Sequence, residues 1–159
     1  MLRISTFLFA MLCLSSAWAG TYDPIISRAW VGESVPGQAT ATLQLNVTTT
    51  KAARLVSVSS THADAIEIHS VTKHKGELKP KVVAGLNLPA HSTITFGSRG
   101  LFLMMTGIKQ QLNSGDKIPV SMVFAIAGNQ TKTITSVAEV RKMELSYKHY
   151  GPNEVYDHR

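Results

Sequence analysis

Alternation of apolar and polar residues with a period of two is the feature that most constrains the fold of this chain. Residues 40–48 place Leu43, Leu45 and Val47 on one face and polar side chains on the other. The same period recurs in four further segments: 56–58, 66–68, 94–96 and 120–126. Such alternation, rich in Val, Ile and Thr and broken by Gly, Pro and Asn turns, predicts half-buried antiparallel strands. We therefore expect one all-β domain, a sandwich or barrel of seven to nine strands.

The methionines of these strands differ in the face they occupy. Residues 101–108 divide between two faces: Leu101, Leu103 and Met105 on one, Phe102, Met104 and Thr106 on the other. Only one of the adjacent Met104 and Met105 can therefore face the core. Met122 alternates with Val120 and Phe124, and it is predicted to fill the core.

Two other strands give specific expectations for single side chains. Around residue 67, Ile66 and Ile68 point one way and Glu67 and His69 the other, so His69 is predicted to point off the core and to be exposed. In residues 54–60 the strict alternation puts Val56 and Val58 on one face and Leu55 on the other.

The first residues have the three parts of a secretory signal. Arg3 precedes an apolar run over residues 4–14, and Ala17-Trp18-Ala19 forms a small-residue cleavage site before Gly20. The run is shorter than the about 20 residues needed to span a bilayer. Cys13 lies within this run, and Ala10-Met11-Leu12 lacks the pattern required for lipid attachment. We expect a signal peptide over 1–19, a soluble exported domain over 20–142 and a polar tail over 143–159, without stable membrane insertion.

Composition removes several classes of function. Loss of Cys13 with the signal leaves no cysteine, which excludes disulfides, thiolate ligands and a cysteine nucleophile. The formal charge of +6 comes from 16 lysines and arginines against 10 acidic residues. The lysines are scattered apart from one cluster over residues 73–81, and no arginine stripe alternates with aromatics, so nucleic-acid binding is not predicted. The sequence has no Gly-x-Ser-x-Gly, phosphate-binding or HExxH motif, and no enzyme is predicted, with a hydrolase the distant alternative. Histidine and methionine are the remaining residues to consider as ligands, and sulfur and imidazole together would select Cu(I) if they form a site.

Several segments, taken in order, resemble one known family. They are 29–31 with Pro36-Gly37, 54–60, 65–69, 88–90, 100–108 and 112–120. These segments resemble the PCuAC family of periplasmic copper chaperones across most of residues 20–159. The resemblance implies a cupredoxin-like antiparallel β-sandwich in the periplasm, and it implies transfer of Cu(I) to an acceptor protein such as the copper centre of a respiratory oxidase.

The family's metal motif is His, ten residues, Met, twenty-one residues, then His-x-Met. Counted from His69, these positions fall without a gap at Pro80, Phe102 and Met104. The resemblance thus implies His69 and Met104 as Cu(I) ligands, while two ligand positions carry other residues. His74 and Met105 are weaker substitutes, as are the histidines His91, His149 and His158. The alternative is a metal-free binding or assembly module that kept the fold and lost the copper site.

Overall fold

The structure is a computed structural model that describes residues 23–74, 77–97, 100–127 and 130–143. Within these ranges the chain forms ten strands and no helix. The strands are β1 (Ile25–Gly32), β2 (Thr40–Thr49), β3 (Ala53–Ser59), β4 (Ala63–His74), β5 (Glu77–Val82), β6 (Leu86–Leu88), β7 (Ser92–Phe96), β8 (Leu101–Ile108), β9 (Lys117–Ile126) and β10 (Gln130–Arg141). The predicted all-β class is confirmed.

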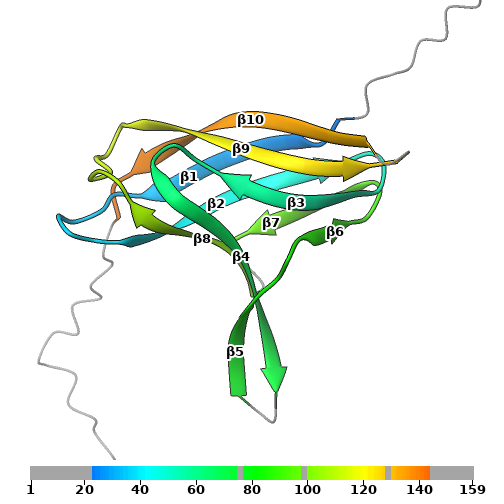
Figure 1. Ribbon diagram of the computed structural model, residues 1–159, viewed down its shortest axis with the longest axis horizontal. Helices are drawn as coiled ribbons and strands as arrows, with labels where there is room; N and C mark the ends of the chain where they lie inside the picture. The colour runs from blue at the N-terminus through cyan, green and yellow to red at the C-terminus, as the bar shows by residue number, and fades with distance from the viewer. Residues whose placement is uncertain (1–22, 75–76, 98–99, 128–129, 144–159) are drawn as a thin grey trace, which may run out of the picture.

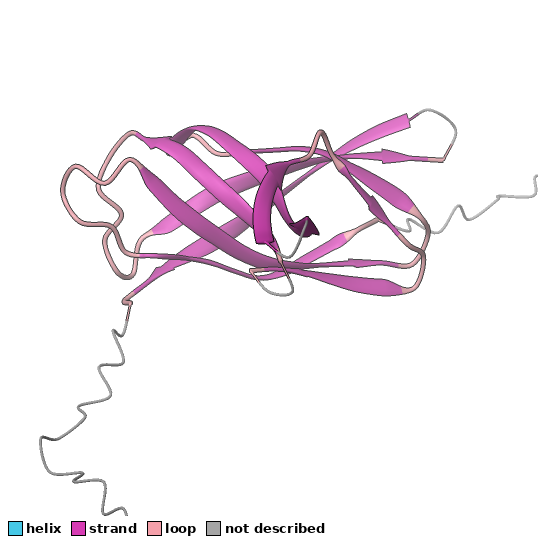
Figure 2. Ribbon diagram, turned by 90° about the horizontal axis from the view of Figure 1, so that it is seen from below, coloured by secondary structure: helices cyan, strands magenta, loops and turns pink. Residues whose placement is uncertain are grey.

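Seven of these strands close into a barrel (Figure 1, Figure 2). The order around it is β4-β8-β2-β1-β10-β9-β3, and a pairing of β3 with β4 completes the ring. Neighbours are antiparallel except β1 and β10, which run parallel. Three shorter strands lie outside the ring: β5 on β4, β6 on β3 and β7 on β2. The expected number is lower partly because β5 contains Lys79-Pro80-Lys81, which carries no apolar alternation.

The core fills the barrel with side chains from the inward-facing positions of its strands. Met105, Met122, Leu103 and Phe124 have no exposed surface. Met122 therefore fills the core as predicted, and Met105 is the inward member of the Met104–Met105 pair. Burial of each such side chain contributes roughly 1.5–3 kcal/mol to folding.

Strand β3 departs from the expected alternation. Leu55 is fully buried and Val58 is 5% exposed, whereas Val56 is 43% exposed. The pairing of β3 with β9 shifts register between Leu55 and Ser57, which marks a bulge. The extra residue lets Leu55 and Val58 face the same interior, so the prediction that Val56 shares a face with Val58 is wrong.

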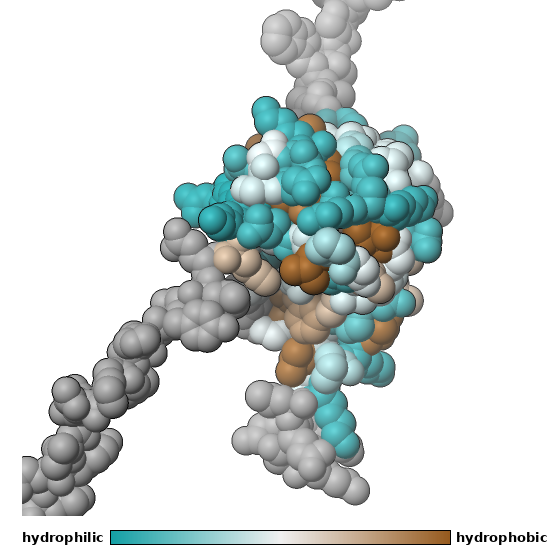
Figure 3. Space-filling view, turned by 90° about the vertical axis from the view of Figure 1, so that its left-hand side faces the viewer, coloured by the Kyte–Doolittle hydropathy of each residue, from teal (hydrophilic) through white to brown (hydrophobic). Residues whose placement is uncertain are grey.

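The β4–β5 hairpin extends beyond the barrel (Figure 1). Strand β4 pairs with β8 from Ala63 to Ser70 and with β5 from His69 to His74, so its second half leaves the ring. At one end of the barrel, hydrophobic side chains are scattered among mainly hydrophilic ones (Figure 3). Among the described residues, no helix is long and apolar enough to cross a membrane.

Candidate metal centre

The register of three strands brings the four motif positions to one face. His69 pairs with Phe102 of β8 on one side and with Val82 of β5 on the other. Cross-strand partners share a face, and so do residues two apart on a strand. Positions 80, 102 and 104 therefore share the face of His69, away from the core residues Ile66 and Ile68. The spacing counted from the sequence matches the geometry, although only His69 and Met104 carry metal donors.

His69 is more enclosed than the sequence predicts. Its ring stacks on Phe102, with centroids 5.2 Å apart and an interplanar angle of 11°. Its side chain is only 16% exposed, so the prediction of an exposed histidine is wrong, although the side chain does point away from the core. The physical reason is the cross-strand aromatic ring, which covers the imidazole.

Glu67 fixes the orientation of the imidazole. Nε2 of His69 lies 3.0 Å from Oε2 of Glu67, two residues earlier on the same face of β4. Because a carboxylate only accepts hydrogen bonds, Nε2 donates in this contact, and in the neutral form of the ring Nδ1 carries the lone pair. A carboxylate that holds one ring nitrogen in this way is a common companion of a histidine ligand.

Met104 lies between His69 and a hollow on the outer surface. It pairs with Glu67 of β4 and with Thr42 of β2, and its side chain is half-buried. The hollow has a volume of about 220 Å³. Its walls include Trp30, Gln44, Met104 and Met143. Met104 therefore adjoins His69 on one side and opens into this hollow on the other.

Met143 is a candidate donor that the sequence did not single out. It follows β10, and the residue is 59% exposed. Its sulfur lies over Gly32 of β1, where a Cβ atom, if one were added to the glycine, would be 3.3 Å from Sδ. The placement depends on the parallel pairing of β1 with β10, in which Gly32 pairs with Arg141. A pairing between the first and last strands leaves no local signal in the sequence.

The weaker substitutes are not brought to this face. Met105 points into the core from the opposite face of β8 and has no exposed surface. His91 is an exposed turn residue before β7, which pairs with the end of β2 remote from Thr42. His74 pairs with Glu77 at the end of β4, where side chains are not described. The tail histidines lie outside the described residues.

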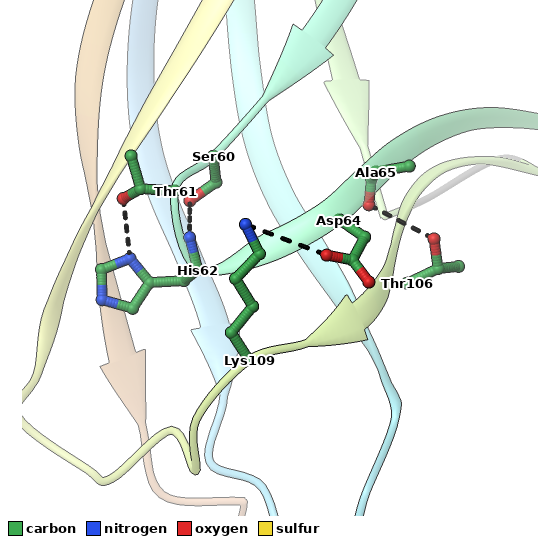
Figure 4. Close-up of polar contacts among 7 residues, drawn as sticks. All are labelled: Ser60, Thr61, His62, Asp64, Ala65, Thr106 and Lys109. Carbon is green, nitrogen blue, oxygen red and sulfur yellow. Dashed lines mark hydrogen bonds and ion pairs between the residues drawn. The ribbon is translucent and has the colours of Figure 1, made fainter.

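His62 belongs to a separate polar cluster at the β3–β4 turn (Figure 4). Its Nδ1 lies 3.2 Å from Oγ1 of Thr61, and its backbone N–H donates to Oγ of Ser60. Nearby, Lys109 and Asp64 form an exposed ion pair at 3.8 Å. These contacts pair polar groups at and near the β3–β4 turn with one another, and they involve neither His69 nor Met104.

The donor set suits a soft monovalent ion. An imidazole and thioether sulfurs are the ligand types that favour Cu(I), whereas Ca²⁺ and Mg²⁺ need several oxygens. In the described part of the chain, no three or more His, Cys, Asp or Glu residues gather as a metal site. A soft-ligand site built on His69 and Met104 thus fits the chemistry better than a hard-cation or zinc site.

Sequence comparison gives two matches. The model of the family "Putative lipoprotein LpqE-like" matches residues 25–136. The "Putative lipoprotein Lxx21020" of Leifsonia xyli subsp. xyli is 31% identical over 124 residues, which cover 77% of this chain and 74% of that protein.

Comparison with solved structures gives the fold. The copper-bound PCuAC domain from PmoF2 superposes with a TM-score of 0.58 at 20% identity, over 76% of this chain and 93% of that one. The Cu(I) form of DR1885 from Deinococcus radiodurans superposes with a TM-score of 0.57 at 21% identity, over 74% of this chain and 77% of that one. The cupredoxin-like fold implied by the sequence resemblance is therefore confirmed.

Proposed function

Because this chain belongs to the LpqE-like lipoprotein family and has the fold of PCuAC domains, we propose that it is an exported copper-chaperone-like protein. Its cargo is Cu(I), and His69 and Met104 are the ligands. The solved structures of this fold include a copper-bound domain and a Cu(I) form, which support the choice of metal.

One observation carries the proposal: the register that sets Met104 diagonally across from His69. His69 pairs with Phe102, and Met104 is two residues further along β8. Diagonal neighbours on adjacent strands have Cα atoms about 7–8 Å apart, within reach of long side chains. Nδ1 of His69 and Sδ of Met104 are then the donors that face one ion.

The site suits cargo that must be passed on. Its donors lie on the outer surface of the barrel rather than within it, so ligands of an acceptor can approach the ion while the first ligands still hold it. Transfer then proceeds by exchange of ligands and needs no catalytic step. A copper-acceptor protein, such as one that receives copper for a respiratory oxidase, is the partner we propose.

Export is part of the same proposal. The family description names lipoproteins, which agrees with an exported protein. We propose that residues 1–19 are removed as a signal peptide and that the protein acts in the periplasm, free of a lipid on Cys13.

Competition for Cu(I) tests the proposal. The protein over residues 20–159 is titrated with Cu(I) against a chromophoric chelator, beside His69→Ala and Met104→Ala. Each substitution is expected to weaken binding by about tenfold or more, because it removes one of few donors. His91→Ala is the matched control for a surface histidine, and it is expected to bind like the unaltered protein. Equal competition by all four proteins contradicts the proposal.

A metal-free binding or assembly module is the second candidate. It is favoured by Phe102, which stacks on His69 where the family motif has a second histidine. On this view the stack and the Glu67 contact close the former metal face, and the fold serves to bind a partner. Absence of any Cu(I) binding by the unaltered protein would support this candidate.

A further inference from the structure

We propose that Met143 supplies a second sulfur ligand to the Cu(I) held by Met104 and His69, in place of the methionine that the family motif has at position 80. This inference rests on the proposed function and adds to it a donor outside residues 25–136, the range that matches the family model.

Met104 and Met143 line the same hollow, Met104 from β8 and Met143 from the segment that follows β10. Met104 of β8 pairs with Thr42 of β2, and the neighbouring pair Leu43–Val31 joins β2 to β1. Gly32, over which Met143 lies, is therefore about two strand spacings from Met104, roughly 10 Å between backbones. Methionine has a long side chain with three rotatable bonds, and two such side chains can close this gap around one ion. His69 on β4 is one strand spacing beyond Met104, so the three-donor site requires the side chain of Met143 to swing from Gly32 toward β8 when the metal binds.

Gly32 makes room for the sulfur. A Cβ atom there would lie 3.3 Å from Sδ and 3.5 Å from Cε of Met143, closer to the sulfur than ordinary packing allows. A larger residue at position 32 would push the side chain of Met143 out from the strand. The glycine thus keeps the thioether low over β1, on the wall that it shares with Met104.

The surroundings of Met143 suit a ligand better than a core residue. The residue is 59% exposed, so it contributes little apolar burial to folding. Glu33 also lines the hollow and brings a negative charge to a site for a cation. The nearby cation Arg141 lies over the ring of Trp30, and its Nε donates to Glu139 at 3.2 Å.

A third donor gives Cu(I) a more complete coordination than His69 and Met104 provide alone. An imidazole with one thioether leaves Cu(I) two-coordinate, whereas an imidazole with two thioethers makes a three-coordinate site of soft ligands. Pro80 cannot provide the second sulfur, since its side chain carries no donor atom. Met105 cannot provide it either, because it is fully buried on the other face of β8.

The test measures both affinity and the atoms around the metal. The protein over residues 20–159 is loaded with Cu(I), and X-ray absorption counts sulfur and nitrogen neighbours, beside Met143→Leu, Met104→Leu and Met105→Leu. Leucine conserves volume, so each variant is expected to keep its fold. We expect two sulfurs in the unaltered protein and in Met105→Leu, one sulfur in Met143→Leu, and an affinity lower by about tenfold or more in Met143→Leu.

The fluorescence of Trp30 provides a second measurement, which reports whether the metal binds near this residue. Trp30 is the only tryptophan in residues 20–159 and lines the same hollow as both methionines. Titration with Ag(I), a redox-inert ion with the same preference for sulfur, is expected to change Trp30 fluorescence, and Met143→Leu is expected to reduce that change.

The outcomes separate the two proposals. One sulfur in the unaltered protein, with unchanged affinity in Met143→Leu and weakened affinity in Met104→Leu, overturns the role of Met143 and leaves the proposed function intact. Absence of Cu(I) binding by the unaltered protein overturns both.

Discussion

A single side chain, Phe102, decides how accessible the imidazole of His69 is. The two residues form a cross-strand pair, and their rings are stacked at 5.2 Å. The sequence predicts which residue stands at each motif position, because that needs only counting from His69. It does not predict the stack or the bond to Glu67, since both depend on how β4 and β8 pair. The position of Met143 is still harder to predict from the sequence, because it depends on the pairing of strands at opposite ends of the chain.

Phe102→His is predicted to tighten Cu(I) binding by about tenfold or more. The substitution puts a second imidazole directly opposite His69, where Cβ atoms of paired residues are about 4.5–5.5 Å apart. The affinity is measured by competition with a chelator. Phe102→Leu is the matched control, because it removes the stack without adding a donor. Equal affinities of the two variants would show that position 102 does not face the ion.

At the scale of elements, the bulge in β3 determines which residues of this strand stabilise the barrel. Period two predicts the strand itself, and that prediction is confirmed. The period of two cannot reveal a bulge, because a bulge is defined by how a strand pairs with its partner strand and not by the strand's own sequence. Because of the register shift between Leu55 and Ser57, Leu55 lies in the core with Val58, and Val56 is exposed.

Leu55→Ala is predicted to lower the free energy of unfolding by about 2–5 kcal/mol, because it leaves a cavity beside β9. Val56→Ala is predicted to change it by about 0.5 kcal/mol or less, because the side chain is on the surface. Urea unfolding of both variants measures the difference. A larger loss in Val56→Ala than in Leu55→Ala would mean that the strand alternates strictly and has no bulge.

At the scale of the whole molecule, the fold class follows from the sequence and the closure of the barrel does not. Alternation recurs along the chain, so an all-β domain can be predicted from local segments alone. The parallel pairing of β1 with β10 joins residues more than a hundred positions apart. Such a contact depends on the packing of the entire sheet, and no segment by itself contains it.

The exported protein is predicted to begin at Gly20. Expression of residues 1–159 with an intact export pathway should yield a water-soluble form whose intact mass corresponds to residues 20–159. The reason is the small-residue site Ala17-Trp18-Ala19 after a short apolar run. Replacement of Ala19 by Arg is expected to block cleavage and retain the longer form. A membrane-bound product with lipid on Cys13 would contradict the prediction.

The parallel pairing of β1 with β10 also places the start of β1 and the end of β10 at opposite ends of the barrel. Both strands run toward the end where Gly32 and Arg141 pair, so the chain enters the barrel at one end and leaves it at the other (Figure 1). A purification tag or surface tether joined ahead of Asp23 attaches away from Met143. A tag joined directly after Met143 begins beside the hollow that Met104 and Met143 line, and Met143 is the residue that we propose as a metal ligand. Attachment chemistry for any binding assay therefore belongs at the amino end of the domain.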